Sequence, residues 1–140
     1  MAVRKTRNDS DFWYCQYDPT TKHLIIDKNG KETGEIVPHY GEATAYWANI
    51  SPASGAAQFE QFGNMGNYDK VIVTRDMNCP IVETTVMFID KQPEYTTVST
   101  YDEKTGQAVT YNLPMYDYLV KRVAKGLDAI AIAVRKVDVG

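Results

Sequence analysis

The chain has 140 residues, a length typical of one domain, and a formal net charge of −3 at pH 7. Hydrophobic residues make up 44% and charged residues 24%, the composition of a globular protein, and acidic side chains outnumber basic ones. Such a charge excludes binding to nucleic acid by bulk electrostatic attraction. The longest apolar run, residues 129–134, is too short to span a membrane. We therefore expect a single domain over residues 1–140 and no membrane partner.

The first residues are basic, because Arg4, Lys5 and Arg7 lie within the first seven positions. No apolar stretch follows them, so this segment lacks the pattern of a secretory signal. We expect residues 1–10 to form a flexible arm and the chain to be made in the cytoplasm. In a reducing compartment, Cys15 and Cys79 are expected to remain free thiols.

Strand patterns recur along the chain and are separated by Gly, Pro, Asn and Asp. The expected strands cover residues 12–17, 23–27, 43–50, 68–74, 85–89, 95–101, 107–112, 116–124 and 130–137. Asn29 and Gly30 suit the tight turn that follows the second of these strands. Residues 56–62 have room for one short helical turn.

The last two expected strands have the clearest pattern. In the first of them, Tyr118, Val120 and Arg122 share one face; in the second, large aliphatic residues alternate with alanines, which suits one packed face. A helix over residues 119–137 is the competing interpretation, because Ala, Lys and Leu favour helices. Short strands at regular spacing, with turn signals between them, predict an all-β fold, a small antiparallel β-barrel or sandwich.

The segment of residues 91–115 does not fit a minimal barrel. It is too long to be a connection that has no secondary structure of its own. Segments rich in Thr, Val and Tyr flank a turn in which Gly106 suits the position with positive φ. We therefore expect an inserted hairpin that protrudes from the barrel. A lone hairpin is marginally stable in water. We therefore expect something outside the barrel to hold it, most simply other copies of the same chain. The candidate contact residues at its tip are Tyr101, Asp102, Glu103 and Lys104.

Reaction chemistry has little support in the sequence. Cys15 or Cys79 with His23 or His39 would make a dyad, but neither cysteine has a predicted helix N-terminus or basic cluster that would lower its pKa. We therefore expect core thiols and surface imidazoles. No Cys or His pair has zinc spacing, the aspartates suit turns rather than a calcium site, and the glycines at 63–66 lack the Lys-Ser/Thr of a phosphate loop. We expect no catalytic residue, no metal site and no cofactor.

Basic side chains gather near the last two expected strands. They are Lys121, Arg122, Lys125, Arg135 and Lys136. Small barrels bind single-stranded nucleic acid through basic grooves, although charged residues at strand edges also prevent aggregation. A small OB-like module that binds single-stranded nucleic acid is therefore the alternative function.

Four segments carry a resemblance to a known family. They are Ala-Asn-Ile-Ser-Pro-Ala-Ser-Gly at 48–55, Tyr-Asp-Lys-Val-Ile-Val at 68–73, Asn-Cys-Pro-Ile at 78–81, and Tyr-Asp-Tyr-Leu-Val-Lys-Arg-Val-Ala-Lys at 116–125. In this order and spacing the chain resembles the head-closure (stopper, or head–tail joining) proteins of long-tailed phages that infect Gram-positive bacteria. The resemblance covers residues 12–137.

The resemblance implies a small β-barrel that forms a homo-oligomeric ring in the virion neck, below the portal and adaptor proteins. Such a ring closes the channel that holds the genomic DNA, without reading its sequence, and a tail-terminator or tail-completion protein docks on it. Family members project a long loop into the channel. Here residues 94–114 are longer and more hairpin-like, so the hairpin tip is expected to face either the channel or a neighbouring subunit. The basic arm is expected to contact the ring above, and Asp102 and Glu103 to keep DNA from adhering.

Overall fold

The structure is a computed structural model, and it describes residues 9–27, 29–52, 68–101 and 105–137. The strands in these ranges are β1 (Asp9–Cys15), β2 (Tyr17–Ile26), β3 (Glu32–Tyr40), β4 (Thr44–Pro52), β5 (Lys70–Thr74), β6 (Val86–Phe88), β7 (Tyr95–Tyr101), β8 (Ala108–Pro114), β9 (Tyr118–Lys125) and β10 (Ile130–Lys136). None of the described residues is helical, which confirms the all-β prediction. The competing helix over residues 119–137 is wrong, because they form β9 and β10. The helical turn expected at 56–62 and arm residues 1–8 lie outside the described residues, whereas Asp9 and Ser10 begin β1.

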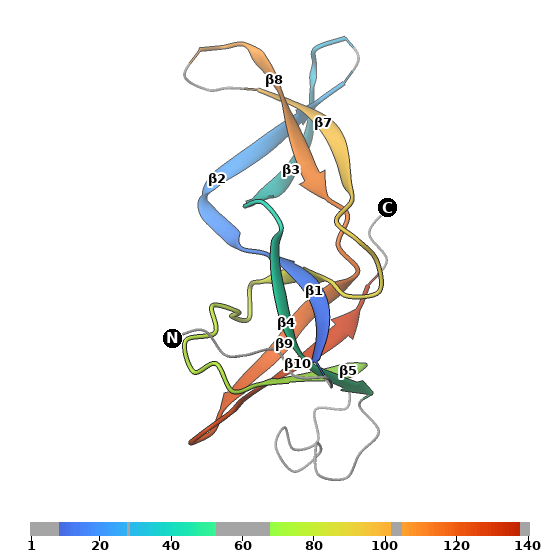
Figure 1. The fold of residues 1–140 in the computed structure, drawn as a ribbon. Helices are drawn as coiled ribbons and strands as arrows, with labels where there is room; N and C mark the ends of the chain where they lie inside the picture. Colours follow the sequence, from blue (N-terminus) through green and yellow to red (C-terminus); the bar gives the residue numbers. More distant parts are fainter. Residues whose placement is uncertain (1–8, 28, 53–67, 102–104, 138–140) are drawn as a thin grey trace.

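Six strands close an antiparallel barrel in the order β1-β4-β5-β10-β9-β6, and β6 pairs back to β1. Figure 1 shows this barrel in the lower half of the molecule. Of the antiparallel barrel and sandwich that the strand spacing left open, the small barrel is the one formed, as the family resemblance implied. A closed barrel has no free strand edges of its own.

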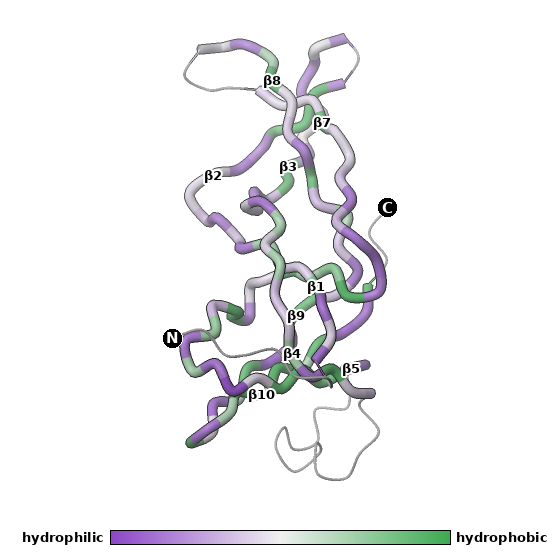
Figure 2. Tube along the Cα trace, in the orientation of Figure 1, coloured by the Kyte–Doolittle hydropathy of each residue, from purple (hydrophilic) through white to green (hydrophobic). Residues whose placement is uncertain are grey.

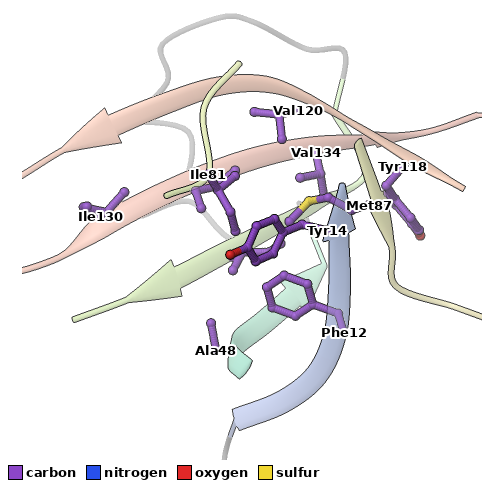
Figure 3. Close-up of a cluster of buried hydrophobic side chains, with 11 residues drawn as sticks. Phe12, Tyr14, Ala48, Ile81, Met87, Tyr118, Val120, Ile130 and Val134 are labelled. Carbon is purple, nitrogen blue, oxygen red and sulfur yellow. The ribbon is translucent and has the colours of Figure 1, made fainter. Parts of the chain in front are cut away.

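The barrel interior holds the main hydrophobic core, shown in Figure 3. Phe12 of β1, Ile72 of β5 and Met87 of β6 are completely buried there. Large inward side chains alternate with small outward ones along β10, where Ala131 and Ala133 are buried against Tyr68 and Val71 on the outer face. The sequence predicted one packed face for this strand, but both faces are packed.

A β-bulge changes the expected faces of β9. The register with β10 shifts between Ala133 and Val134, so that Lys121 is the extra residue in β9. Tyr118 and Val120 point into the core as expected, but after the bulge Val123 continues the inner face and Arg122 does not. The prediction that Arg122 shares the face of Val120 is therefore wrong.

Two hairpins form a second sheet above the barrel, in the order β3-β2-β7-β8; we call it the distal sheet. In the chain, β2 and β3 interrupt the connection from β1 to β4, and β7 and β8 interrupt the connection from β6 to β9. Figure 2 shows that strongly hydrophobic residues are concentrated in and next to the barrel, whereas the distal sheet is mostly hydrophilic or intermediate. The two hairpins cross, and a single ladder pair, Ile25 with Thr100, links β2 to β7 in the described residues.

The predicted hairpin is present, and its seven-residue register runs from Tyr95 with Pro114 to Tyr101 with Ala108. Gly106 has a φ of 72°, as its place in the turn predicted. The expected support from outside the barrel is present, but it comes from the β2–β3 hairpin of the same chain rather than from another copy. Sequence reasoning did not find β3, since its glutamates, glycine and proline are disfavoured in strands and tolerated at a sheet edge.

Candidate functional site

The hairpins meet each other and the barrel at a cluster of aromatic side chains that we call the aromatic joint. Its members are Tyr17, His23, His39, Tyr40, Tyr95, Tyr111 and Tyr116. The ring of Tyr40 is central, with its centroid 5.8 Å from that of Tyr17 and 5.9 Å from that of Tyr116. It packs on the cluster of Cys15, Val86 and Phe88 that covers the outside of the barrel. Burial raises the pKa of Tyr40 to about 12, so its hydroxyl stays protonated at neutral pH.

Two tyrosine hydroxyls of the β7–β8 hairpin accept hydrogen bonds from the end of the other hairpin. The Tyr111 hydroxyl accepts from the backbone N–H of Tyr40 at 2.8 Å. The Tyr95 hydroxyl accepts from the backbone N–H of Ala43 at 3.3 Å. Both donors lie where β3 leaves the distal sheet and the chain returns to the barrel. The tyrosines therefore fix the position at which one hairpin rests on the other.

A pair of histidines lies under the Tyr111 ring. His23 Nε2 and His39 Nδ1 are 2.8 Å apart, so one imidazole donates a hydrogen bond to the other. The His23 ring stacks on Tyr111 with a centroid distance of 3.9 Å and an angle of 10° between the planes. Burial lowers the pKa of His23, and the neighbouring His39 lowers it further. The expectation of surface imidazoles is wrong, because both rings are half-buried and pack in one cluster with Tyr111.

Two aspartates attach the start of the β7–β8 insertion to the barrel. The buried Asp117 carboxylate accepts hydrogen bonds from the N–H groups of Ile89 and Asp90, each at 2.9 Å. The Asp90 carboxylate accepts one from the Tyr118 hydroxyl at 2.8 Å and also contacts Lys70 and Lys136. Burial would raise the pKa of Asp90, but these hydrogen bonds and charges lower it. This arrangement holds the chain in place as it leaves β6.

The candidate contact residues at the hairpin tip are only partly placed. Tyr101 ends β7 with 40% of its surface exposed. The Tyr101 hydroxyl lies 3.7 Å from the position that a Cβ atom on Gly106 would occupy. The Tyr101 side chain therefore extends across the hairpin toward Gly106. Asp102, Glu103 and Lys104 lie outside the described residues, as do Arg4, Lys5 and Arg7 of the arm.

The outer strands of the distal sheet are open edges among the described residues. Residues 32–36 of β3 and residues 108–110 of β8 are exposed, including Ile36 (55%) and Val109 (42%). The β3 edge carries Glu32, Glu35 and Pro38, which protect an edge against further pairing. The β8 edge, by contrast, has no Asp, Glu, Lys or Arg. Because Pro114 ends the strand, residues 108–112 are the part of the β8 edge that is suited to accept another strand.

The described residues offer little for catalysis. Burial raises the pKa of Cys15 to about 11, which keeps this thiol protonated and makes it a poor nucleophile. Cys15 and Cys79 are both free, as expected. Within the part of the chain that the structure describes, no three His, Cys, Asp or Glu side chains are placed to hold a metal ion. That the protein has no catalytic activity stays a prediction.

Sequence reasoning missed the aromatic joint. The ten tyrosines were a signal, but composition does not say which of them meet. Tyr111 was placed correctly in a strand, yet its partners come from a hairpin whose second strand was not expected. The pairing of His23 with His39 needed the register of that strand.

Comparisons with protein-family models, curated proteins and solved structures found no match. None of the described residues belongs to a helix that is long and apolar enough to cross a membrane.

Proposed function

We propose that this protein is a structural component of a phage neck that forms a ring below the portal and adaptor proteins. The ring closes the DNA channel and provides the surface to which a tail-terminator or tail-completion protein attaches. The proposal rests on the resemblance of four ordered segments to head-closure proteins, together with the small barrel. The observation that carries it is the unprotected β8 edge, because a ring needs a surface that the subunit does not satisfy by itself.

The distal sheet supports a role in assembly rather than catalysis. Its outer strands expose Ile36 and Val109, and its strand β7 exposes Tyr95 and Tyr101. Hydrogen bonds of Asp117 attach the β7–β8 insertion to the barrel, and those of Tyr95 and Tyr111 attach it to the end of the β2–β3 hairpin, so its position is fixed. A β8 edge in a fixed orientation can add a strand from a neighbouring subunit with defined geometry.

One substitution tests whether this edge forms the ring. Thr110→Lys places a charge on the exposed β8 edge, and Ser99→Lys is the matched control, since Ser99 lies directly opposite Thr110 on the inner strand β7. Mass by light scattering and negative-stain images, of the chain alone and with its portal-side partner, should show rings for the wild type and Ser99→Lys. Thr110→Lys should remain monomeric. Equal ring formation by both variants contradicts the use of this edge.

The place in the virion is tested separately. Antibody against the chain should label the neck in negative-stain images of virions made from the genome that encodes it. Labelling elsewhere, or absence from the particle, overturns the proposal. The nucleic-acid alternative predicts a monomer that binds labelled single-stranded oligonucleotides with an affinity that falls steeply with salt. Exposed Lys121, Arg122 and Lys125 on β9 would then carry the binding, and their replacement by Gln should abolish it.

A further inference from the structure

Exposed cations on β9 have no counter-ion of their own. Arg122 and Lys125 are exposed, as is Lys121 at the bulge, and none of the three forms an ion pair with another described residue. Basic side chains can protect an open strand edge, but β9 lies between β6 and β10 in a closed barrel and has no open edge. These charges therefore remain free to meet a partner.

An exposed leucine lies beside the cations. Leu127, in the turn from β9 to β10, is fully exposed. We call Arg122, Lys125 and Leu127 the basic tip. A nucleic acid would neutralise the cations through its phosphates, but the leucine gains free energy only where apolar surface is buried. A basic tip with an apolar residue at its end therefore favours a protein surface as its partner, one that is acidic and carries an exposed aliphatic side chain.

The open edge of β3 has these two properties. Glu32 and Glu35 are exposed and lie three positions apart, the same separation as the two cations of the basic tip. Ile36 follows them, with 55% of its surface exposed. Neither glutamate forms an ion pair with another described residue. We call Glu32, Glu35 and Ile36 the acidic edge; it complements the basic tip in charge, in spacing and in its apolar end.

The two patches of one chain lie far apart. Figure 1 shows the turn from β9 to β10 at the lower end of the barrel, whereas β3 belongs to the distal sheet above the barrel. The basic tip therefore meets an acidic edge only on another copy. Because the two patches are different, such a contact is heterologous, and each copy can engage one neighbour with its tip and another with its edge.

We propose that the basic tip of one copy docks on the acidic edge of a second copy. The cations of the tip then face the glutamates of the edge, and Leu127 packs against Ile36. The contact does not use the β8 edge, so it goes beyond the proposed function and does not depend on it. Exposed ion pairs are weak and are screened by salt. By itself, the contact therefore joins soluble chains only at low ionic strength.

Sedimentation of the Thr110→Lys chain tests the contact, because this variant blocks pairing at the β8 edge. Its average mass should rise with protein concentration at about 20 mM salt and be that of a monomer at about 500 mM. Adding Lys125→Glu or Glu35→Lys should weaken the low-salt association by about tenfold. Lys22→Glu and Glu83→Lys make the same changes of net charge at exposed positions outside both patches. These two controls should associate like the parent chain.

An equimolar mixture of the Lys125→Glu and Glu35→Lys chains provides the sharpest test. Each variant alone places like charges across the contact, whereas in the mixture the new glutamate of one chain faces the new lysine of the other. The mixture should therefore recover the association that both variants lose separately. Leu127→Ala should weaken association without affecting the fold.

Three results would overturn the proposal. The first is a monomer at every salt concentration, and the second is a mixture that associates no better than its separate components. The third is a loss of oligonucleotide binding in Lys125→Glu together with unchanged association of Glu35→Lys, which would assign the cations to nucleic acid.

Discussion

The hydroxyl of Tyr111 accepts a hydrogen bond at 2.8 Å from the backbone N–H of Tyr40, although 71 positions separate the two residues. This bond joins the last residue of β3 to the middle of β8. The bond gives the Tyr40 N–H an acceptor outside the strand pairing. It also holds the Tyr111 ring against His23 and His39. The bond is thus a link between the two hairpins of the distal sheet.

Tyr111→Phe should destabilise the protein by about 1–2 kcal/mol, because it leaves a half-buried N–H without an acceptor while it keeps the ring. Urea unfolding measures this loss. Tyr95→Phe is the matched control, since its hydroxyl accepts at the longer distance of 3.3 Å and its ring is 42% exposed. Its effect should be smaller. Equal losses would mean that the Tyr111 hydrogen bond stabilises the protein no more than the Tyr95 hydrogen bond does.

Asp117→Asn should cost about 2 kcal/mol, because an amide offers one acceptor oxygen where the carboxylate now serves two N–H groups. The loss should appear first as faster hydrogen exchange at Ile89 and Asp90. Asp128→Asn, in the exposed turn between β9 and β10, should leave stability unchanged. Normal exchange at Ile89 in Asp117→Asn would refute this role of the carboxylate.

Ile132→Ala should destabilise the barrel by about 2–5 kcal/mol, because this completely buried side chain lies in the main core. Leu127→Ala removes a comparable side chain from a fully exposed turn and should have almost no effect on the free energy of unfolding. Thermal or urea unfolding compares the two variants. A small loss for Ile132→Ala would contradict the position given to β10 in the core.

The Asp90 carboxylate should stabilise the folded protein at neutral pH, and this contribution to the free energy of unfolding should disappear at acidic pH. Its pKa is lowered in the folded protein, so its favourable interactions are fully present above the unfolded value of about 3.9 and disappear as the pH falls through the folded value. The effect should be modest, because 38% of the side chain is exposed. Asp90→Asn should flatten the pH dependence of urea unfolding below about pH 4, and an unchanged slope would contradict this contribution of Asp90.

The sequence alone predicted the strands that carry strong local signals. Alternating Ile and Ala in β10 placed Ile132 inward, and the turn residues placed Gly106 and Gly30 at positive φ, where the structure has them. It failed at β3, whose strand-disfavouring residues are tolerated because the strand lies at an edge, and at Arg122, because a bulge depends on the partner strand.

Local chemistry thus predicted an all-β fold with a protruding hairpin, and it left open whether the strands form a barrel or a sandwich. That inference needs only the period of two and the glycine turns, which act between residues that are close in sequence. Tertiary structure alone decided that a second hairpin supports the first and that His23, His39 and Tyr111 meet. Such contacts depend on how two hairpins that are distant in sequence pack against each other. No local conformational preference of the chain encodes that packing.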